Sequence, residues 1–172
     1  MQLIEPSLEF ESSFARFYED FAANDEINSD YYLEGVLNFK AYIQCLQDEA
    51  MGINLVEDYV QCSHFWLVDA QKNIYGAIRV RHNIDTELLA LEAGHIGYDI
   101  APEYRSEGYG TLMLKKALLK AKAIGLSKAL VVADEDNMAS RKVIEANGGQ
   151  LENVVFGKVY PNPLARYWIE CH

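Results

Sequence analysis

The distribution of hydrophobic and polar positions changes about one third of the way along the chain. Up to residue 51, apolar residues recur every three or four positions, which indicates amphipathic helices. Four phenylalanines share one such stripe: Phe10, Phe14, Phe17 and Phe21. From residue 63 onward, short runs rich in β-branched and aromatic residues indicate strands, and helical patterns separate some of them.

These patterns predict a single α/β domain over residues 1–172. Helices are expected at residues 8–21, 32–51, 111–124 and 137–146, and strands at residues 2–5, 63–69, 74–81, 94–100, 127–133, 151–160 and 165–170. The strands at 63–69 and 74–81 form an antiparallel hairpin, and later helices cross over between strands of the same mixed sheet. Residues 23–30 are expected to be a loop, 52–61 an irregular link, and 83–91 a loop or bulge.

The composition argues against several classes of protein. No apolar run reaches the roughly 18 residues of a membrane helix, and the N-terminus lacks the basic and apolar regions of a signal peptide. The three cysteines, Cys45, Cys62 and Cys171, are scattered, and none has a partner at metal-ligand spacing. We therefore expect a cytoplasmic protein with reduced thiols, no membrane partner and no metal.

The charge is both negative and uneven. A net charge of −11 argues against a nucleic-acid partner, because phosphate contacts need lysine and arginine. Residues 1–62 hold 13 acidic and 2 basic side chains, whereas residues 101–150 hold 8 basic and 6 acidic ones. The basic segment suits an anionic ligand. The acidic segment suits a cationic ligand or simply forms a hydrated surface.

The basic segment contains a glycine-rich turn, Arg105-x-x-Gly108-x-Gly110, that leads into a helix. The first N–H groups of a helix lack internal partners and carry partial positive charge, so they attract anions. The two glycines would let a phosphate approach the backbone closely, and Arg105 adds a fixed charge. The chain has no Gly-Lys-Ser/Thr triplet, and Met113 replaces the third glycine of a dinucleotide fingerprint.

The whole unit, Ile100-x-Pro102-x-x-Arg105-x-x-Gly108-x-Gly110 between a strand and a helix, resembles the acetyl-CoA-binding motif of the GNAT N-acetyltransferase superfamily. A second segment, Asn137-x-x-Ser140-Arg141 followed by Gly148, resembles the family's next helix. The runs GHIGYDIAPEYR and SRKVIEANGG further resemble a bacterial subgroup of predicted acetyltransferases. The resemblance implies a mixed, mostly antiparallel sheet with splayed central strands, flanked by about four helices.

The resemblance also implies a binding mode for acetyl-CoA. Its pyrophosphate would lie on the backbone of the turn, beside Arg105, at Ser106, Glu107, Gly108, Tyr109, Gly110 and Thr111. Its pantetheine arm would pair with the strand backbone from Tyr98 to Ile100 and with the side chain of Asn137. Ser140 and Arg141 would lie near the phosphates.

The reaction implied by the resemblance is direct attack of an amine on the thioester. An alkylamine has a pKa near that of lysine, about 10.4, so a base must take its proton. His95 is one candidate and is equally suited to a structural role, His82 could meet it across the sheet, and Asp99 and Glu92 are weaker candidates. The tetrahedral oxyanion would be held by a backbone N–H near Tyr98 or Asp99.

The sequence departs from the family pattern at the usual proton donor. Many relatives place a tyrosine seven residues after the motif asparagine, where this chain has Ile144. Tyr160 and Tyr167 are candidates to replace it, and a thiol also leaves tolerably without a donor, as the thiolate.

Three hypotheses for the function follow. The first is an N-acetyltransferase for a small, cationic primary amine, with a possible homodimer. The second is a protein or peptide N-acetyltransferase. The third is a non-catalytic acyl-CoA sensor, which the absent tyrosine alone favours.

Overall fold

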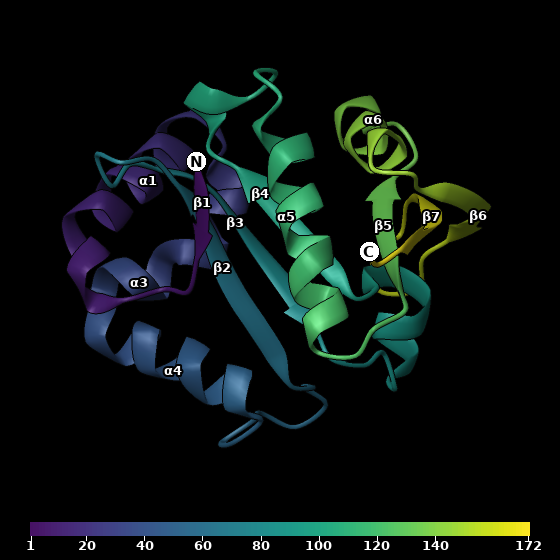
Figure 1. Cartoon of the computed structure of the whole chain (residues 1–172), viewed down its shortest axis with the longest axis horizontal. Coiled ribbons are helices and arrows are strands. Elements are labelled where there is room, and N and C mark those ends of the chain that lie inside the picture. Colours follow the sequence, from purple (N-terminus) through teal and green to yellow (C-terminus); the bar gives the residue numbers. More distant parts are fainter.

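The computed structural model describes all 172 residues, and its seven strands form one sheet in the order β1-β2-β3-β4-β5-β7-β6 (Figure 1). The strands are β1 (Gln2–Ile4), β2 (Cys62–Val68), β3 (Ile74–Arg81), β4 (Ile96–Ile100), β5 (Lys128–Asp134), β6 (Gln150–Phe156) and β7 (Pro163–Glu170). Every neighbouring pair is antiparallel except β4 and β5. The predicted mixed, mostly antiparallel sheet and its hairpin are confirmed.

Helices cover both faces of this sheet. They are α1 (Glu11–Asn24), α2 (Glu26–Ser29), α3 (Leu33–Leu37), α4 (Phe39–Met51), α5 (Tyr109–Ala123) and α6 (Met138–Ala146), with short turns η1 (Leu8–Phe10), η2 (Asp30–Tyr32) and η4 (Pro102–Tyr104) and the π-helical segment η3 (Leu89–Ala93). Residues of β2 alternate between two cores: Trp66 packs with the phenylalanines of α1, and Leu67 packs with α5. None of the helices is long and apolar enough to cross a membrane.

The central strands separate after a single pair. The parallel strands β4 and β5 are in register only at Ile96 and Val131, and the N–H of His95 donates to the carbonyl of Leu130 at 2.7 Å just before it. Beyond this closed end, β4 keeps pairing with β3 and β5 with β7. The predicted splay is confirmed, and Figure 1 shows the two strands diverging beside α5.

Two predictions for the N-terminal third are wrong. The expected helix at residues 32–51 is divided at Asn38, whose side chain accepts a hydrogen bond from the N–H of Ala41 and begins α4. Val36, just before the division, is 44% exposed. The expected loop at 23–30 contains α2, which begins at the capping residue Asp25. Asparagine and aspartate compete with the backbone in this way, so they begin helices inside otherwise continuous patterns.

Residues 83–91 were expected to be a loop or bulge. The last of them belong to η3, which ends at Ala93 and is followed by Gly94, a residue with positive φ. A Cβ on Gly94 would lie 2.4 Å from the carbonyl oxygen of Leu130, so only glycine allows this segment to lie so close to β5. The η3 segment therefore lies beside the closed end of the splay.

Candidate active site

The turn before α5 leaves a row of backbone N–H groups without partners. Gly108 caps the helix with a φ of 85°, and Ser106 is also left-handed, with a φ of 66°. The first N–H of α5 to bond within the chain is that of Leu112, to the carbonyl of Gly108 at 3.1 Å. The N–H groups from Ser106 to Thr111 stay free, and nothing lies within 4 Å of a Cβ built on Gly108. This geometry suits an anion.

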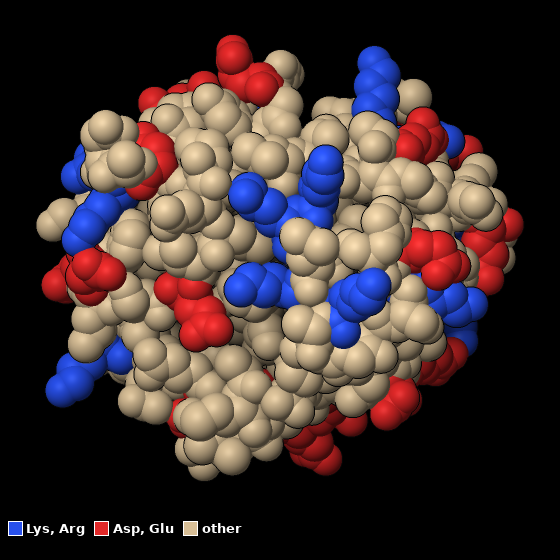
Figure 2. Space-filling model, viewed as in Figure 1, with Lys and Arg blue, Asp and Glu red and all other residues tan.

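Positive charge surrounds this helix. Figure 2 shows Lys and Arg side chains gathered at the centre of the face that Figure 1 shows in the same view, where α5 lies. Four lysines belong to α5: Lys115, Lys116, Lys120 and Lys122. In a chain of net charge −11, this local excess favours a polyanionic ligand on this face.

Arg105 does not face the free N–H groups. Its Nη2 donates to Asp25 Oδ2 at 2.5 Å, its Nε donates to the carbonyl of Ile100 at 3.0 Å, and its guanidinium lies over the Phe21 ring. These contacts tie the turn to α1 and α2. The structure thus gives Arg105 a tethering contact in place of the expected position beside a pyrophosphate.

The open edge of β4 offers unpaired backbone groups. The N–H of Arg81 bonds to the carbonyl of His95, and the N–H of Ala101 bonds to the carbonyl of Tyr75, so odd-numbered residues of β4 pair with β3. Because backbone groups alternate along a strand, Tyr98 and Ile100 direct their N–H groups toward the splay. The oxyanion donor is therefore best placed at Tyr98, and the N–H of Asp99 is used by β3.

The far side of the splay is formed by the start of α6. Asn137 caps this helix through its Oδ1, which accepts from the N–H of Ser140 at 3.0 Å, and this leaves its amide NH₂ free. The Tyr98 hydroxyl lies 2.9 Å from Ser140 Oγ and thus bridges the two sides. Arg141 is turned away, with its Nε on the Tyr167 hydroxyl and its Nη1 on the carbonyl of Glu135. No contact directs Arg141 to the turn before α5, where it was expected.

A cavity of 1270 Å³ opens beside the splay, on the face of the sheet where α3 and α4 lie. Its lining runs from α3 and α4 across β2, β3 and β4 to Asn137 and Ser140. Seven acidic side chains and two arginines belong to this lining, so it attracts cations such as an ammonium group.

Asp99 is the carboxylate of β4 in this cavity. Its Oδ2 accepts from the Tyr32 hydroxyl at 2.8 Å and lies 3.4 Å from Arg79 Nη1. Burial, together with the Asp99 charge, raises the pKa of Tyr32 well above its usual value, so Tyr32 remains a donor. Asp99 is thereby held in place one residue from the Tyr98 N–H.

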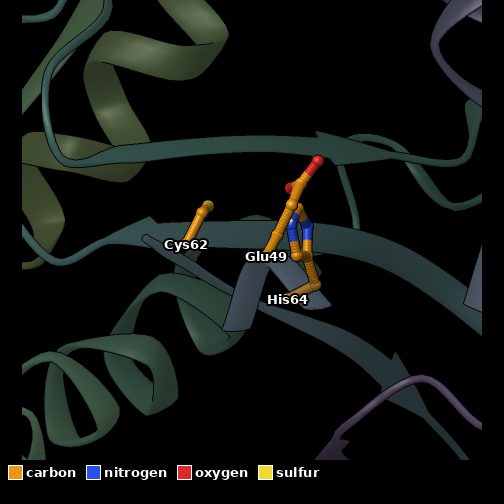
Figure 3. A group of neighbouring side chains, drawn as sticks. All are labelled: Glu49, Cys62 and His64. Carbon is orange, nitrogen blue, oxygen red and sulfur yellow. Dashed lines mark hydrogen bonds and ion pairs between the residues drawn. The ribbon is translucent and has the colours of Figure 1, made fainter. Parts of the chain in front are cut away.

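A second polar cluster lies deeper in the cavity, between α4 and β2 (Figure 3). Glu49 Oε2 lies 2.6 Å from His64 Nε2, and Cys62 lies on the same face of β2. Burial alone would lower the pKa of His64, but the neighbouring Cys62 and Glu49 outweigh it and raise the pKa to about 9. At neutral pH His64 is therefore a cation that cannot act as a base.

Glu49, Cys62 and His64 each offer one ligand atom within 4.8 Å of the others, which is a donor set that zinc accepts. However, the strand register places Arg79 opposite His64 and Arg81 opposite Cys62. Two guanidinium groups beside the cluster disfavour a further cation, and Glu49 and His64 already form an ion pair.

Of the other expected catalytic side chains, His95, Tyr167 and His82 do not line the cavity, whereas Glu92 does. His95 is 6% exposed, and its Nδ1 accepts from the N–H of Leu130 at the closed end of the splay. Tyr167 is 1% exposed and is held between Arg141 and Glu145. His82 bonds to Ser63 and not to His95, and Glu92 accepts backbone N–H groups from Lys158 to Tyr160. These contacts favour structural roles, whereas Tyr160 does line the cavity.

Several residues of the cavity had no signal in the sequence. Tyr32, Glu49, His64 and Arg79 come from four elements, and none of them belongs to a local motif. The β-strand period could have linked only one of them, His64, to a neighbour, because it places Cys62 on the same face.

Comparison with known proteins assigns the class. Residues 11–150 match the family of the acetyltransferase (GNAT) domain. The chain therefore belongs to the GNAT family, and this membership together with the fold makes it an acetyl-CoA-dependent N-acetyltransferase. No curated protein sequence matches the chain significantly.

Solved structures agree on the fold at low sequence identity. A chimera of the spermidine N-acetyltransferase SpeG from Vibrio cholerae and hSSAT is 18% identical, with a TM-score of 0.64 over 99% of this chain and 96% of that chain. Mycobacterium smegmatis RimJ in complex with CoA-disulfide is 17% identical, with a TM-score of 0.73 over 98% and 80%. The ribosomal-protein-S5-alanine acetyltransferase from Vibrio fischeri is 15% identical, with a TM-score of 0.65 over 99% and 92%. The names of these neighbours include both small-molecule and protein acceptors.

Proposed function

We propose that this protein transfers an acetyl group from acetyl-CoA to the primary amine of a small molecule by direct attack. The observation that carries the proposal is the unpaired edge of β4. It lies between the free N–H groups before α5 and an acidic cavity, so it connects a site for an anion with a site for an ammonium group.

The chain supplies backbone donors for the thioester. The free N–H of Tyr98 would hold the carbonyl oxygen and the negative charge that develops on it as the amine nitrogen bonds to the carbon. The Asn137 amide and the Ile100 N–H would position the pantetheine arm along the same edge. As the carbon–sulfur bond breaks, the thiol leaves as a thiolate, because Ile144 is fully buried in the core and no donor stands in its place.

The chain supplies a carboxylate for the amine. Asp99, fixed by Tyr32 and Arg79, would orient the incoming ammonium and receive its proton, directly or through water in the cavity. The acidic lining supports an acceptor whose amine arrives as a cation. We take a small molecule as the acceptor because the acidic side chains line a cavity rather than a flat surface, and the peptide hypothesis becomes an outcome of the substrate test.

The first test is titration of acetyl-CoA by calorimetry into the protein and two glycine variants. Gly108 and Gly125 both have positive φ, 85° and 96°, and both have open space where a side chain would project. Gly108→Trp should abolish binding by filling the anion site. The equally strained Gly125→Trp, at the other end of α5, should bind normally.

The second test is thiol release with a panel of primary amines and short peptides. Turnover of small amines supports the proposal, and turnover of peptides alone would replace it with the peptide hypothesis. Acetyl-CoA binding without turnover of any amine would favour the sensor. Equal binding by both glycine variants would contradict the assigned anion site.

A further inference from the structure

Arg81 is a half-buried arginine of the acceptor cavity that has no acidic partner. Its Nη1 donates to the carbonyls of Ala93 and Gly94, at 3.4 and 3.0 Å, at the end of η3. Its Nε and Nη2 have no partner, and no side-chain nitrogen of the chain is both fully buried and unpartnered. Each of these two atoms therefore keeps some solvent-accessible area, and Arg81 belongs to the cavity lining.

The edge formed by Nε and Nη2 is the part of a guanidinium that binds a carboxylate with two parallel hydrogen bonds. Burial and the neighbouring Arg79 lower the pKa of Arg81, so its charge lacks the compensation that an anion would supply. An arginine stays charged in proteins, so this charge is left available to a ligand.

Arg166 of β7 also bonds to carbonyls of η3, and it has the carboxylate partner that Arg81 lacks. Its Nη1 donates to two carbonyls of the same η3 segment, those of Ala90 and Leu91. Its Nε and Nη2 both bond to Glu152 Oε2, at 3.1 and 3.0 Å. Arg81 resembles Arg166 in donating Nη1 to two carbonyls at or beside η3, but its Nε and Nη2 have no carboxylate partner, and Arg81 lines the acceptor cavity.

We propose that Arg81 binds a carboxylate of the acceptor, so that the substrate is an amino carboxylate with its two charged groups far apart. The inference rests on the proposed function and names the substrate class of that site. The amine would lie at Asp99 and the carboxylate at Arg81.

The strand register sets the spacing of these groups. The N–H of Arg81 bonds to the carbonyl of His95, and Asp99 lies four residues further along β4. At ~3.3 Å per residue the backbones of Arg81 and Asp99 are roughly 13 Å apart. An α-amino acid is too short for this span. An ω-amino acid or a short extended peptide fits it.

The test compares ε-aminocaproate with its uncharged amide as acceptors, with β-alanine as a short control. The wild-type protein should prefer the carboxylate over the amide by about 10- to 100-fold in kcat/KM, the value of a charged bidentate contact. Arg81→Gln should remove this preference, so that the carboxylate and the amide are turned over with similar kcat/KM. Arg81→Lys, which keeps the charge but not the fork, should restore part of it.

Arg166→Gln is the matched control, because it loosens the same η3 segment but leaves the vacant edge intact. It should retain the preference for the carboxylate. Equal wild-type rates on both acceptors, or a preference that survives in Arg81→Gln, would overturn the inference and leave the proposed function standing.

Calorimetric binding of the product, N-acetyl-ε-aminocaproate, separates the two proposals. Binding to the wild type that is lost in Arg81→Gln supports the carboxylate site even if no amine is turned over, in which case only the proposed function fails. No binding to the wild type, with turnover of other amines, overturns the carboxylate site alone.

Discussion

The two sides of the splay are built from different kinds of groups. Toward α5 and α6, the site consists mainly of backbone N–H groups, at the turn from Ser106 to Thr111 and at Tyr98 and Ile100. Toward α3 and α4, the site consists of side chains that fix one another, such as Asp99 with Arg79 and Tyr32. A backbone site accepts the constant part of a cosubstrate, whereas a side-chain site can change with the acceptor.

The strongest expected difference between the two sides is at Asp99. Asp99→Asn should lower kcat/KM for the amine by about 10²–10⁴, because the amine loses the group that orients and deprotonates it. Its affinity for acetyl-CoA should stay the same, since the backbone side is untouched. Asp134 lines the same cavity but does not pair with Arg79, so Asp134→Asn should have little effect on kcat/KM.

A parallel measurement of thermal unfolding is needed for Asp99→Asn, because Arg79 would lose its carboxylate. A loss of activity accompanied by weaker acetyl-CoA binding would mean that both sides have collapsed. That result would contradict the separation of the two sides.

A second difference concerns pH. The pKa of His64 is raised to about 9 in the folded state, above the ordinary histidine value of 6.5. Its contribution to the free energy of unfolding is therefore fully present below the unfolded pKa and is lost as the pH rises through about 9. We expect up to about 3 kcal/mol of stability to be lost between about pH 6 and pH 10.

Chemical denaturation of the wild type and of His64→Gln at several pH values checks this contribution. The variant should lose most of the pH dependence in this window. Glu49→Gln, which removes the partner carboxylate and keeps the imidazole, should reduce it as well. An unchanged pH profile in His64→Gln would show that this histidine titrates normally.

The smallest expected effect lies on the backbone side. Tyr98→Phe removes the bond to Ser140 across the splay but keeps the Tyr98 N–H. A neutral hydrogen bond contributes about 0.5–1.5 kcal/mol, so acetyl-CoA should bind roughly 2- to 10-fold more weakly, as measured by calorimetry. A complete loss of binding would mean that the hydroxyl, and not the backbone, positions the ligand.

The same contrast explains what the sequence could predict. The turn at Gly108 and the cap at Asn137 are local, so their residue types and spacing revealed them. The pattern also predicted the central strands, because residues of β2 to β5 and β7 are buried in a core. The helix break at Asn38 was missed because a capping side chain competes with a pattern that otherwise continues.

The side-chain half of the site was predicted poorly for a physical reason. His95 and Tyr167 have suitable chemistry, but the fold buries them and commits their polar atoms to Leu130, Arg141 and Glu145. Conversely, nothing in the sequence distinguishes Arg81 from other strand arginines. In the fold, its Nη1 donates to carbonyls at the end of η3, and its Nε and Nη2 have no partner. Such partnerships depend on contacts between elements that lie far apart in the sequence.

The most direct measurement is residue-resolved amide hydrogen exchange by NMR, with and without acetyl-CoA. In the free protein, the amides of Tyr98 and Ile100 should exchange quickly, and those of Gly97 and Asp99, which pair with β3, slowly. Acetyl-CoA should protect Tyr98, Ile100 and the amides from Tyr109 to Thr111. Binding that leaves the Tyr98 and Ile100 amides unprotected would contradict the assignment of the open β4 edge as the cosubstrate site.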